Sequence, residues 1–402
     1  MADSTLALSE SLPDSVSGLN QDLAVLSNQD SEVSFLWDTT FSSSFPQRTH
    51  TRLPPIHEAL PLLNEYFEGF NCVFPVFHQP SFLRLVAESY TRDCQDDSGW
   101  WAALNVALAL AHRLRPMKVF ASQEEDQLAW RYLQNALAVV TELTLRNTDL
   151  LGVQAILGMA IILQGTPNPH PASILVTTAI RLSHNLGLHK KDHNTGLTSL
   201  EMEQRNRVFW IAYILDKDFS LRLDQPPIQS DDDIGIELPS KNPEDGLGYI
   251  STLDETSSIN IFRLRVHLAV IQGRIYKSLY SLQALRHSEQ ERIAAVQDLD
   301  RMLENWKRGI PFDFQPENIG RPLSRSSVLH LVILHLSYLN CLTMVHRVSI
   351  QNKHWTTNVL NSSKQGLSMG QSVASHQHCL EAARASVRLL QLLPQGDYAF
   401  MW

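Results

Sequence analysis

The sequence predicts an all-α fold, a large multi-helix bundle that follows a disordered, acidic and serine-rich N-terminal tail. From about residue 53 onward, apolar residues recur at i, i+3, i+4 and i+7, and short stretches rich in Pro, Gly and Asn separate these segments. The alternation of apolar and polar residues that is typical of a half-buried strand is not convincing anywhere. We therefore expect residues 1–52 to form the tail and residues 53–402 to form one helical domain.

The first 50 residues contain eleven serines and seven acidic residues but one basic residue, Arg48. Such a segment cannot bury enough apolar surface to offset the entropy lost on ordering, which predicts disorder. Within it, SEVSFLWDTTF (31–41) places aromatic residues among acidic ones, a pattern that some partner-docking segments use. An unspecialised linker is the simpler interpretation, and the sequence leaves both open.

The first helices of the domain each carry an apolar stripe that needs a neighbour to cover it. These helices are expected at residues 57–70, 100–114, 126–143 and 150–165. The next stripe runs through Leu175, Ala179 and Leu182. Its helix should end near Gly187, because glycine can take the left-handed conformation that closes a helix.

A central helix is expected to begin at Thr198 and Glu201, which form the T-x-x-E pattern of a capping box. Residues 208–215 are apolar on every face of this helix, which predicts that it is buried. Asp216 aligns with the buried part, so its carboxylate needs a partner, and Arg181 from the preceding helix is a candidate. Later helices are expected at residues 258–286, 289–308, 325–350 and 374–393.

Composition excludes several classes of protein. The chain has 33 basic and 42 acidic residues, a net charge of −9, and no dense basic patch that would attract nucleic acid. Its four cysteines lack C-x2-C spacing, which argues against a disulfide framework and a cysteine zinc site. The apolar stretches 100–111 and 150–163 fall short of the roughly 20 residues that a bilayer crossing needs. We expect an intracellular protein without a membrane segment or secretion signal.

Three consecutive acids, Asp231 to Asp233, are a candidate for chemistry, because carboxylates can coordinate magnesium. A cavity near this acidic turn would make the chain an all-α enzyme or a metabolite-binding protein. However, the acids follow Pro226-Pro227 and should lie in a turn, where neighbouring side chains point apart. We interpret them as a solvated turn that caps a helix or meets a basic residue.

Histidine clusters and catalytic motifs give little support to an enzyme. His184, His189 and His193 cannot share one helix face, because Gly187 ends the helix between them. The HQHC stretch (376–379) is too tightly spaced for one ordinary metal site. Nucleophile elbows, phosphate loops and zinc-protease motifs do not occur. We therefore predict that the chain is not an enzyme and holds no metal or cofactor.

The stretch FWIAYILDKDFSLRLDQPPIQSDDDIGIELP (209–239) resembles the signature of the fungal-specific transcription factor domain. This domain, also called the middle homology region or xylanolytic-activator type, occurs in zinc-binuclear-cluster regulators. The landmarks of the family pattern correspond to Glu203, Arg207, Phe209, Trp210, Asp216, Ser220, Pro226, Asp231 to Asp233, Leu238 and Pro239. Further segments that are similar to the family, in the same order, are 62–82, 179–190, 306–311, 334–347 and 379–390.

Two departures from the family pattern stand out. Asp224-Gln225 replaces the Gly-Arg of the family's turn, which removes a residue that freely adopts positive φ and a base that could pair with the acids. In addition, residues 1–56 contain no cysteine. The family's N-terminal six-cysteine cluster, which holds two zinc ions and contacts DNA, is therefore absent from this sequence.

The resemblance implies the regulatory body of a nuclear regulator of RNA polymerase II transcription, in a metabolic or secondary-metabolite pathway. Its implied partners are other transcription factors or the transcription machinery, without direct sequence-specific DNA contact by this chain. A small-molecule effector and a dimer are both compatible with the resemblance. The chain could be a natural regulator that works with another factor, or a product that lacks an upstream exon. The signature residues would then organise the domain around the central helix.

Overall fold

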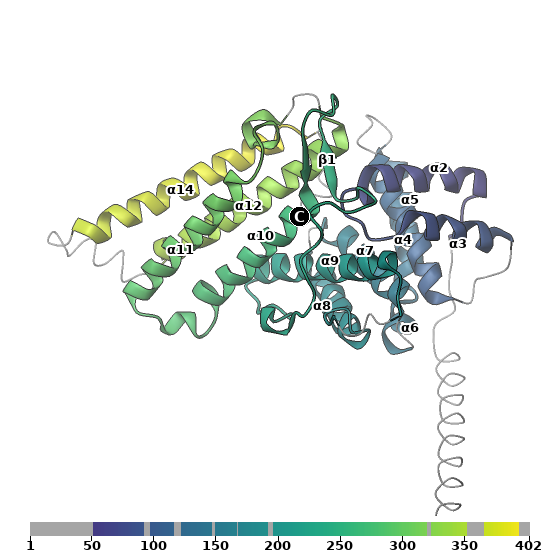
Figure 1. The fold of residues 1–402 in the computed structure, drawn as a ribbon, viewed down its shortest axis with the longest axis horizontal. Coiled ribbons are helices and arrows are strands. Elements are labelled where there is room, and N and C mark those ends of the chain that lie inside the picture. The colour runs from purple at the N-terminus through teal and green to yellow at the C-terminus, as the bar shows by residue number, and fades with distance from the viewer. Residues whose placement is uncertain are drawn as a thin grey trace, which may run out of the picture. The chain divides into compact units, whose positions relative to one another are not determined.

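The computed structural model of the protein describes most of the chain beyond residue 50. The described residues are 51–91, 97–115, 122–146, 149–166, 168–191, 196–319, 323–351 and 366–393. Contacts divide the chain into residues 1–49 and residues 50–402. The predicted tail, except for residues 51 and 52, lies outside the described residues, as does its acidic-aromatic stretch 31–41. Apart from one short hairpin, the regular structure of the described part is helical, which confirms the predicted fold class (Figure 1).

The first half of the domain is built around α4 and α7. Its elements are α2 (Ile56–Tyr66), the π-helical turn η1 (Phe67–Asn71), α3 (Gln79–Thr91), α4 (Ser98–Leu114), α5 (Ser122–Leu137), α6 (Val140–Leu145), α7 (Leu150–Leu163) and α8 (His170–Asn185). Helix α4 packs on α2, α5 and α7, and α7 packs on α8. The side chains of Asp97 and Asp149 cap the N-termini of α4 and α7 by accepting backbone N–H bonds.

The second half continues from α8 onto α9 and α10, then onto three further helices. The longer elements are α9 (Ser199–Leu223), α10 (Ile261–Ile275), α11 (Glu289–Arg308), α12 (Arg325–Gln351) and α14 (Gly366–Leu390). The short ones are η4 (Asp231–Asp233), η5 (Tyr276–Tyr280), η6 (Ala284–Arg286), η7 (Phe312–Phe314) and η8 (Pro316–Asn318). Helix α12 packs on α10, α11 and α14, which form the green and yellow part of Figure 1.

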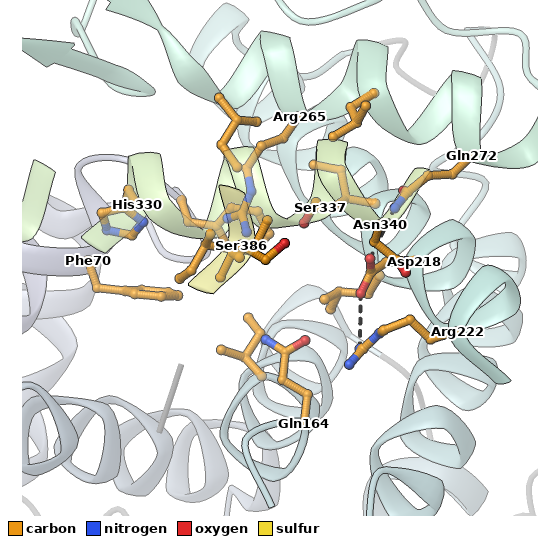
Figure 2. A pocket seen from close by; sticks show the side chains of 18 of the residues that line it. Phe70, Gln164, Asp218, Arg222, Arg265, Gln272, His330, Ser337, Asn340 and Ser386 are labelled. Atoms are coloured by element: carbon orange, nitrogen blue, oxygen red, sulfur yellow. Dashed lines mark hydrogen bonds and ion pairs between the residues drawn. The ribbon is translucent and has the colours of Figure 1, made fainter. Parts of the chain in front are cut away.

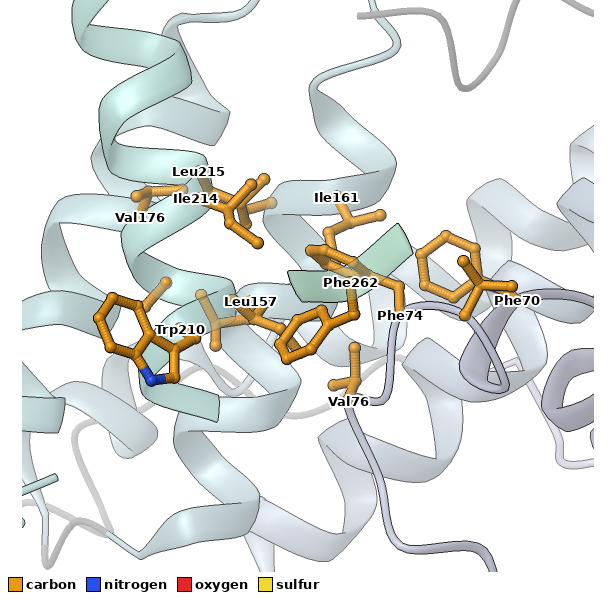
Figure 3. Close-up of a cluster of buried hydrophobic side chains, with 14 of the residues drawn as sticks. Phe70, Phe74, Val76, Leu157, Ile161, Val176, Trp210, Ile214, Leu215 and Phe262 are labelled. Carbon is orange, nitrogen blue, oxygen red and sulfur yellow. The ribbon is translucent and has the colours of Figure 1, made fainter. Parts of the chain in front are cut away.

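Helix α9 begins as the sequence predicts. The Thr198 side chain accepts the N–H of Glu201, and the Glu201 side chain accepts the N–H of Thr198, so both halves of the capping box form. Farther along, Phe209, Trp210 and Leu215 are buried, and Figure 3 shows Trp210 and Leu215 in a cluster with side chains from α7 and from the segment after α2. The prediction of a central, buried helix is confirmed.

Three local features differ from the sequence prediction. Helix α3 was not expected, and α5 and α6 are separate helices where one was expected over 126–143. The helix expected from residue 258 begins at Ile261, because Ser258–Asn260 forms strand β2 against β1 (Tyr249–Ser251). The Asn260 side chain then caps α10 by accepting the N–H of Arg263. Strands of three residues are too short to show an alternating pattern.

Helix α12 contains the most apolar long stretch of the described residues. Residues Arg325–Val348 are long and apolar enough to cross a bilayer by length and composition alone. In the structure, 61% of the most apolar window is buried inside the protein. The apolar surface of α12 therefore has protein neighbours to cover it, as expected of a core helix.

Candidate functional site

The predicted buried aspartate lies on α9, but its partner is not the predicted one. Asp216 is 4% exposed, and its two oxygens accept the backbone N–H groups of Ile228 at 2.9 Å and Gln229 at 3.0 Å. Burial raises the pKa of Asp216, and the two N–H bonds oppose that rise. Arg181 is exposed on the surface of α8, so the expected Asp216–Arg181 pair is wrong. Main-chain donors of the segment that follows α9 replace it.

One of the three consecutive acids meets a buried base. Lys217 is 2% exposed, and its ammonium donates to the carbonyl of Gln229 at 2.5 Å and lies 3.0 Å from Asp231 Oδ1. The Tyr213 hydroxyl donates to the same Asp231 oxygen at 2.9 Å, and burial raises the pKa of Tyr213. Asp232 and Asp233 are exposed. This geometry agrees with the interpretation of a solvated turn in which a carboxylate meets a basic residue.

Arg207 and Trp210 of α9 contact the C-terminal end of the segment that follows this helix, at Asp245 and Glu237. The Arg207 guanidinium donates two bonds to the Asp245 carboxylate at 2.6 and 2.7 Å, and its Nε donates to Glu203 at 3.0 Å. Burial alone would raise the pKa of Asp245, but the bonds and charge of Arg207 outweigh it and keep that pKa below its usual range. Trp210 Nε1 donates to the carbonyl of Glu237 at 3.0 Å.

The near end of the segment leaves α9 through a left-handed residue. Asp224 has φ 54° and ψ 46°, so an aspartate adopts the left-handed conformation here, where the pattern that the sequence resembles has a glycine. Aspartate is one of the few non-glycine residues that tolerate it. The Ser220 hydroxyl donates to the carbonyl of Gln225 at 2.5 Å, Pro226 is exposed, and Arg263 donates to the carbonyl of Pro239.

We call residues 224–245 the strap, because polar groups on one face of α9 contact it at successive turns. These groups belong to Arg207, Trp210, Tyr213, Asp216, Lys217 and Ser220. Successive residues of this group are three positions apart, except that Asp216 and Lys217 are neighbours, and this spacing places them on one side of the helix. Sequence reasoning missed Tyr213, Lys217, Gln229 and Asp245. The signal that the sequence offered was that Tyr213 and Lys217 fall on the same side of the helix as Arg207. The apolar residues around Tyr213 made this signal hard to recognise.

The histidines form pairs rather than a three-ligand cluster. His184 Nε2 lies 2.6 Å from the Gln229 side-chain oxygen, and the His184 and His189 rings are 4.6 Å apart. His193 lies outside the described residues. In the HQHC stretch, His378 stacks on His346 at 4.5 Å. Among the described residues, no group of three or more His, Cys, Asp or Glu is placed to hold a metal ion.

A cavity of about 440 Å³ lies beside α9 (Figure 2), and the α9 residues that line it, Ile214, Leu215, Asp218 and Arg222, are not those that contact the strap. Side chains of α7, α9, α10, α12 and α14 line it, together with Phe70 and Phe74 from the segment after α2. The lining is mainly apolar, and its charged side chains are Asp218, Arg222 and Arg265. None of the acids of the 231–233 turn lines it. This cavity is thus separate from the place where the enzyme alternative would put one.

Comparison with known proteins agrees with the signature on α9. Residues 63–308 match the family described as "Fungal specific transcription factor domain". The chain is 50% identical over 366 residues to an ABC-transporter-regulating transcription factor of Aspergillus oryzae, and 49% identical to the Aspergillus fumigatus protein of that name. Each of these alignments spans 90% of this chain and 41% of the relative.

A more distant relative gives the same result. The chain is 34% identical over 363 residues to the "Fusaridione A cluster transcription factor fsdR" of Fusarium heterosporum, covering 89% of this chain and 66% of that protein. The chain therefore spans less than half the length of the two Aspergillus relatives. The family match covers more than half of this chain and includes all of α9 and the strap. The chain belongs to the fungal-specific transcription factor domain family.

Proposed function

We propose that the chain regulates transcription of RNA polymerase II genes in the nucleus, through its helical domain and protein partners. The observation that carries the proposal is the family match over residues 63–308. The relatives named as regulators of an ABC transporter and of a fusaridione cluster favour target genes in metabolism or secondary metabolism. This chain spans 41% of the Aspergillus oryzae relative, so the assignment of that protein's kind of activity to this chain is part of the proposal.

We propose that contact with DNA is made by a partner or by sequence outside these 402 residues. The sequence contains four cysteines, too few for the six-cysteine zinc cluster of the family. Its net charge of −9 also works against attraction to a phosphate backbone. We accordingly propose that these residues hold no zinc cluster.

The signature residues have a structural role in this proposal. Five of the signature residues form hydrogen bonds within α9 or to the strap through their polar groups: Glu203, Arg207, Trp210, Asp216 and Ser220. These contacts support a role in positioning the strap on α9 rather than in catalysis. Phe209 is fully buried in the core, Pro239 is buried, and Pro226 and Asp232 are exposed in the strap. We propose that the chain is a regulator and not an enzyme, with the cavity as the site of a small-molecule effector.

A reporter assay tests this function. The 402-residue chain, fused to an unrelated sequence-specific DNA-binding domain, should change expression of a reporter that carries the matching operator, and a fluorescent fusion should accumulate in the nucleus. The DNA-binding domain alone and an operator-free reporter are the controls. An unchanged reporter with the fusion present in the nucleus would contradict a regulatory role of this chain.

A further inference from the structure

The cavity beside α9 has an uneven distribution of charge. Asp218 is satisfied within the protein, because Gln272 donates to one of its oxygens at 3.0 Å and Arg222 lies 2.9 Å from the other. The dashed contact in Figure 2 marks this Asp218–Arg222 pair at one side of the cavity. The charges of these two residues therefore cancel.

Arg265 is the remaining charged side chain of the lining, and Figure 2 shows it extending into the cavity from α10. Its guanidinium lies 4.9 Å from the ring centroid of Phe74. Within the described part of the chain, no carboxylate or carbonyl forms an ion pair or hydrogen bond with it. Burial lowers the pKa of Arg265 to about 10, although the negative charge of Asp218 opposes that fall, so Arg265 stays protonated at neutral pH. A guanidinium in an apolar setting is unfavourable until an anion pairs with it.

His330 adds an unused acceptor but no charge. Its Nε2 lies 3.2 Å from the carbonyl of Gly69, which makes Nε2 the donor and leaves Nδ1 as an acceptor. Nδ1 is buried and has no hydrogen-bond partner among the described residues. Burial and the charge of Arg265 lower the pKa of His330 to about 3. With His330 neutral and the Asp218–Arg222 pair cancelled, the lining keeps the single positive charge of Arg265.

We propose that this cavity binds an amphipathic organic acid, whose anionic head pairs with Arg265 and whose apolar body contacts the aliphatic lining. The planar guanidinium can bind a carboxylate or sulfonate through two parallel hydrogen bonds. The apolar walls come from side chains such as Ile214, Leu268 and Leu334. A volume of about 440 Å³ is within the usual range for small-ligand sites. The inference rests on the proposed effector role and names its chemical class.

Matched probes test the charge requirement on the purified 402-residue chain. Decanoate and decan-1-ol share an apolar body and differ in the anionic head, and calorimetric titration measures the dissociation constant of each. A hydrogen-bonded charge contributes roughly tenfold to a hundredfold in affinity, so decanoate should bind tighter than the alcohol by about that factor. Equal affinity for the two probes would overturn the proposal without any variant.

Variants then locate the site. Arg265→Gln should abolish the preference for decanoate, whereas Arg274→Gln, an exposed arginine on the same helix, should keep it. Ser337→Phe adds bulk to the lining and should weaken both probes by about tenfold or more. A preference that survives Arg265→Gln, or unchanged binding in Ser337→Phe, would place the probes elsewhere and overturn the proposal. Arg265→Lys, which keeps the charge, should retain part of the preference if the glutamine variant does not fold.

The effector role fails separately from the ligand class. In one outcome, decanoate binds more tightly than decan-1-ol, but the reporter output is the same for the wild type and Ser337→Phe. This result would support the site and contradict the effector role. A reporter that responds to the fusion, in a chain that binds neither probe, leaves transcription regulation standing and overturns the ligand class.

Discussion

Asp216 is a buried acid that accepts hydrogen bonds from two main-chain N–H groups. The effect of replacing it on stability therefore depends on how those two N–H groups are left. Asp216→Ala leaves the N–H groups of Ile228 and Gln229 without their acceptor. An unsatisfied buried group costs about 1–3 kcal/mol, so the free energy of unfolding should fall by more than about 2 kcal/mol. Urea unfolding of the variant and the wild type measures the difference.

Asp232→Ala is the matched control on the same strap. Asp232 is exposed, and its carboxylate makes no hydrogen bond or ion pair with the residues that the structure describes. Its removal should change the free energy of unfolding by less than about 0.5 kcal/mol. Equal effects of the two substitutions would show that the Asp216 bonds contribute nothing particular to stability.

Residue identity predicted the need for a partner at Asp216 but not which partner. The base proposed from the sequence was an arginine on the preceding helix, whereas the actual donors are amides twelve and thirteen residues further on. Backbone amides occur at every residue except proline, so the sequence carries no mark that distinguishes these two. The positive φ of Asp224 was missed for a related reason, because aspartate is only an occasional left-handed residue.

At the scale of elements, the Arg207–Asp245 pair ties the strap to the start of the buried part of α9. Asp245→Asn should lower the free energy of unfolding at pH 7 by about 1 kcal/mol, a small value because the Asp245 side chain is 31% exposed. The folded-state pKa of Asp245 lies below its usual value of 3.8, so its contribution is present above that pH and is lost as the pH falls through the folded-state pKa.

The pH dependence separates the ion pair from a simple loss of packing. The difference in unfolding free energy between wild type and Asp245→Asn should shrink as urea titrations move from pH 6 toward pH 3. Glu244→Gln, at the exposed neighbouring residue, should show little difference at any pH. A difference for Asp245→Asn that stays constant over this range would argue that the charge of Asp245 is not what stabilises the strap.

The crossing of α4 and α7 depends on the absence of a side chain at Gly158. A Cβ at this position would lie 2.2 Å from Val106 Cγ1, so either the Val106 side chain or the two helices would have to shift. Gly158→Ala should lower the melting temperature, with overpacking of about 1–3 kcal/mol exceeding the gain of up to about 1 kcal/mol in helix propensity. Thermal unfolding followed by circular dichroism measures it.

Two further variants test that explanation. Gly69→Ala adds a methyl group only 3.5 Å from Leu114, an ordinary contact, and should leave the melting temperature nearly unchanged. Adding Val106→Ala to Gly158→Ala should recover part of the loss, because it removes the atoms that clash. Losses that simply add in the double variant would rule out the contact with Val106 as the cause.

The structure was predicted best where the sequence carries strong local signals. It was predicted worst where contacts between distant residues determine the local structure. The Thr198–Glu201 box and the continuous apolar run fixed the start and burial of α9. The hairpin and the cavity follow from contacts between distant residues, such as Arg265 on α10 with Phe74. A single sequence shows periodicity along one element, but it does not show which side chains of five elements converge.

At the scale of the whole molecule, the family match ends at residue 308 but the core does not, so we propose that residues 53–402 form one folding unit. Helix α12 contributes Leu331, Val332 and Val345, all fully buried, and it packs on α10 and α11.

A chain truncated after Ile319 would expose the apolar surfaces that α12 covers, and each large buried side chain contributes about 1.5–3 kcal/mol. We expect that fragment to lose its cooperative thermal transition and near-ultraviolet circular dichroism, whereas a chain truncated after Leu393 should keep both. A cooperative transition in the shorter fragment, at the temperature of the full chain, would place the end of the folding unit near residue 308 and make α12 an attachment rather than part of the core.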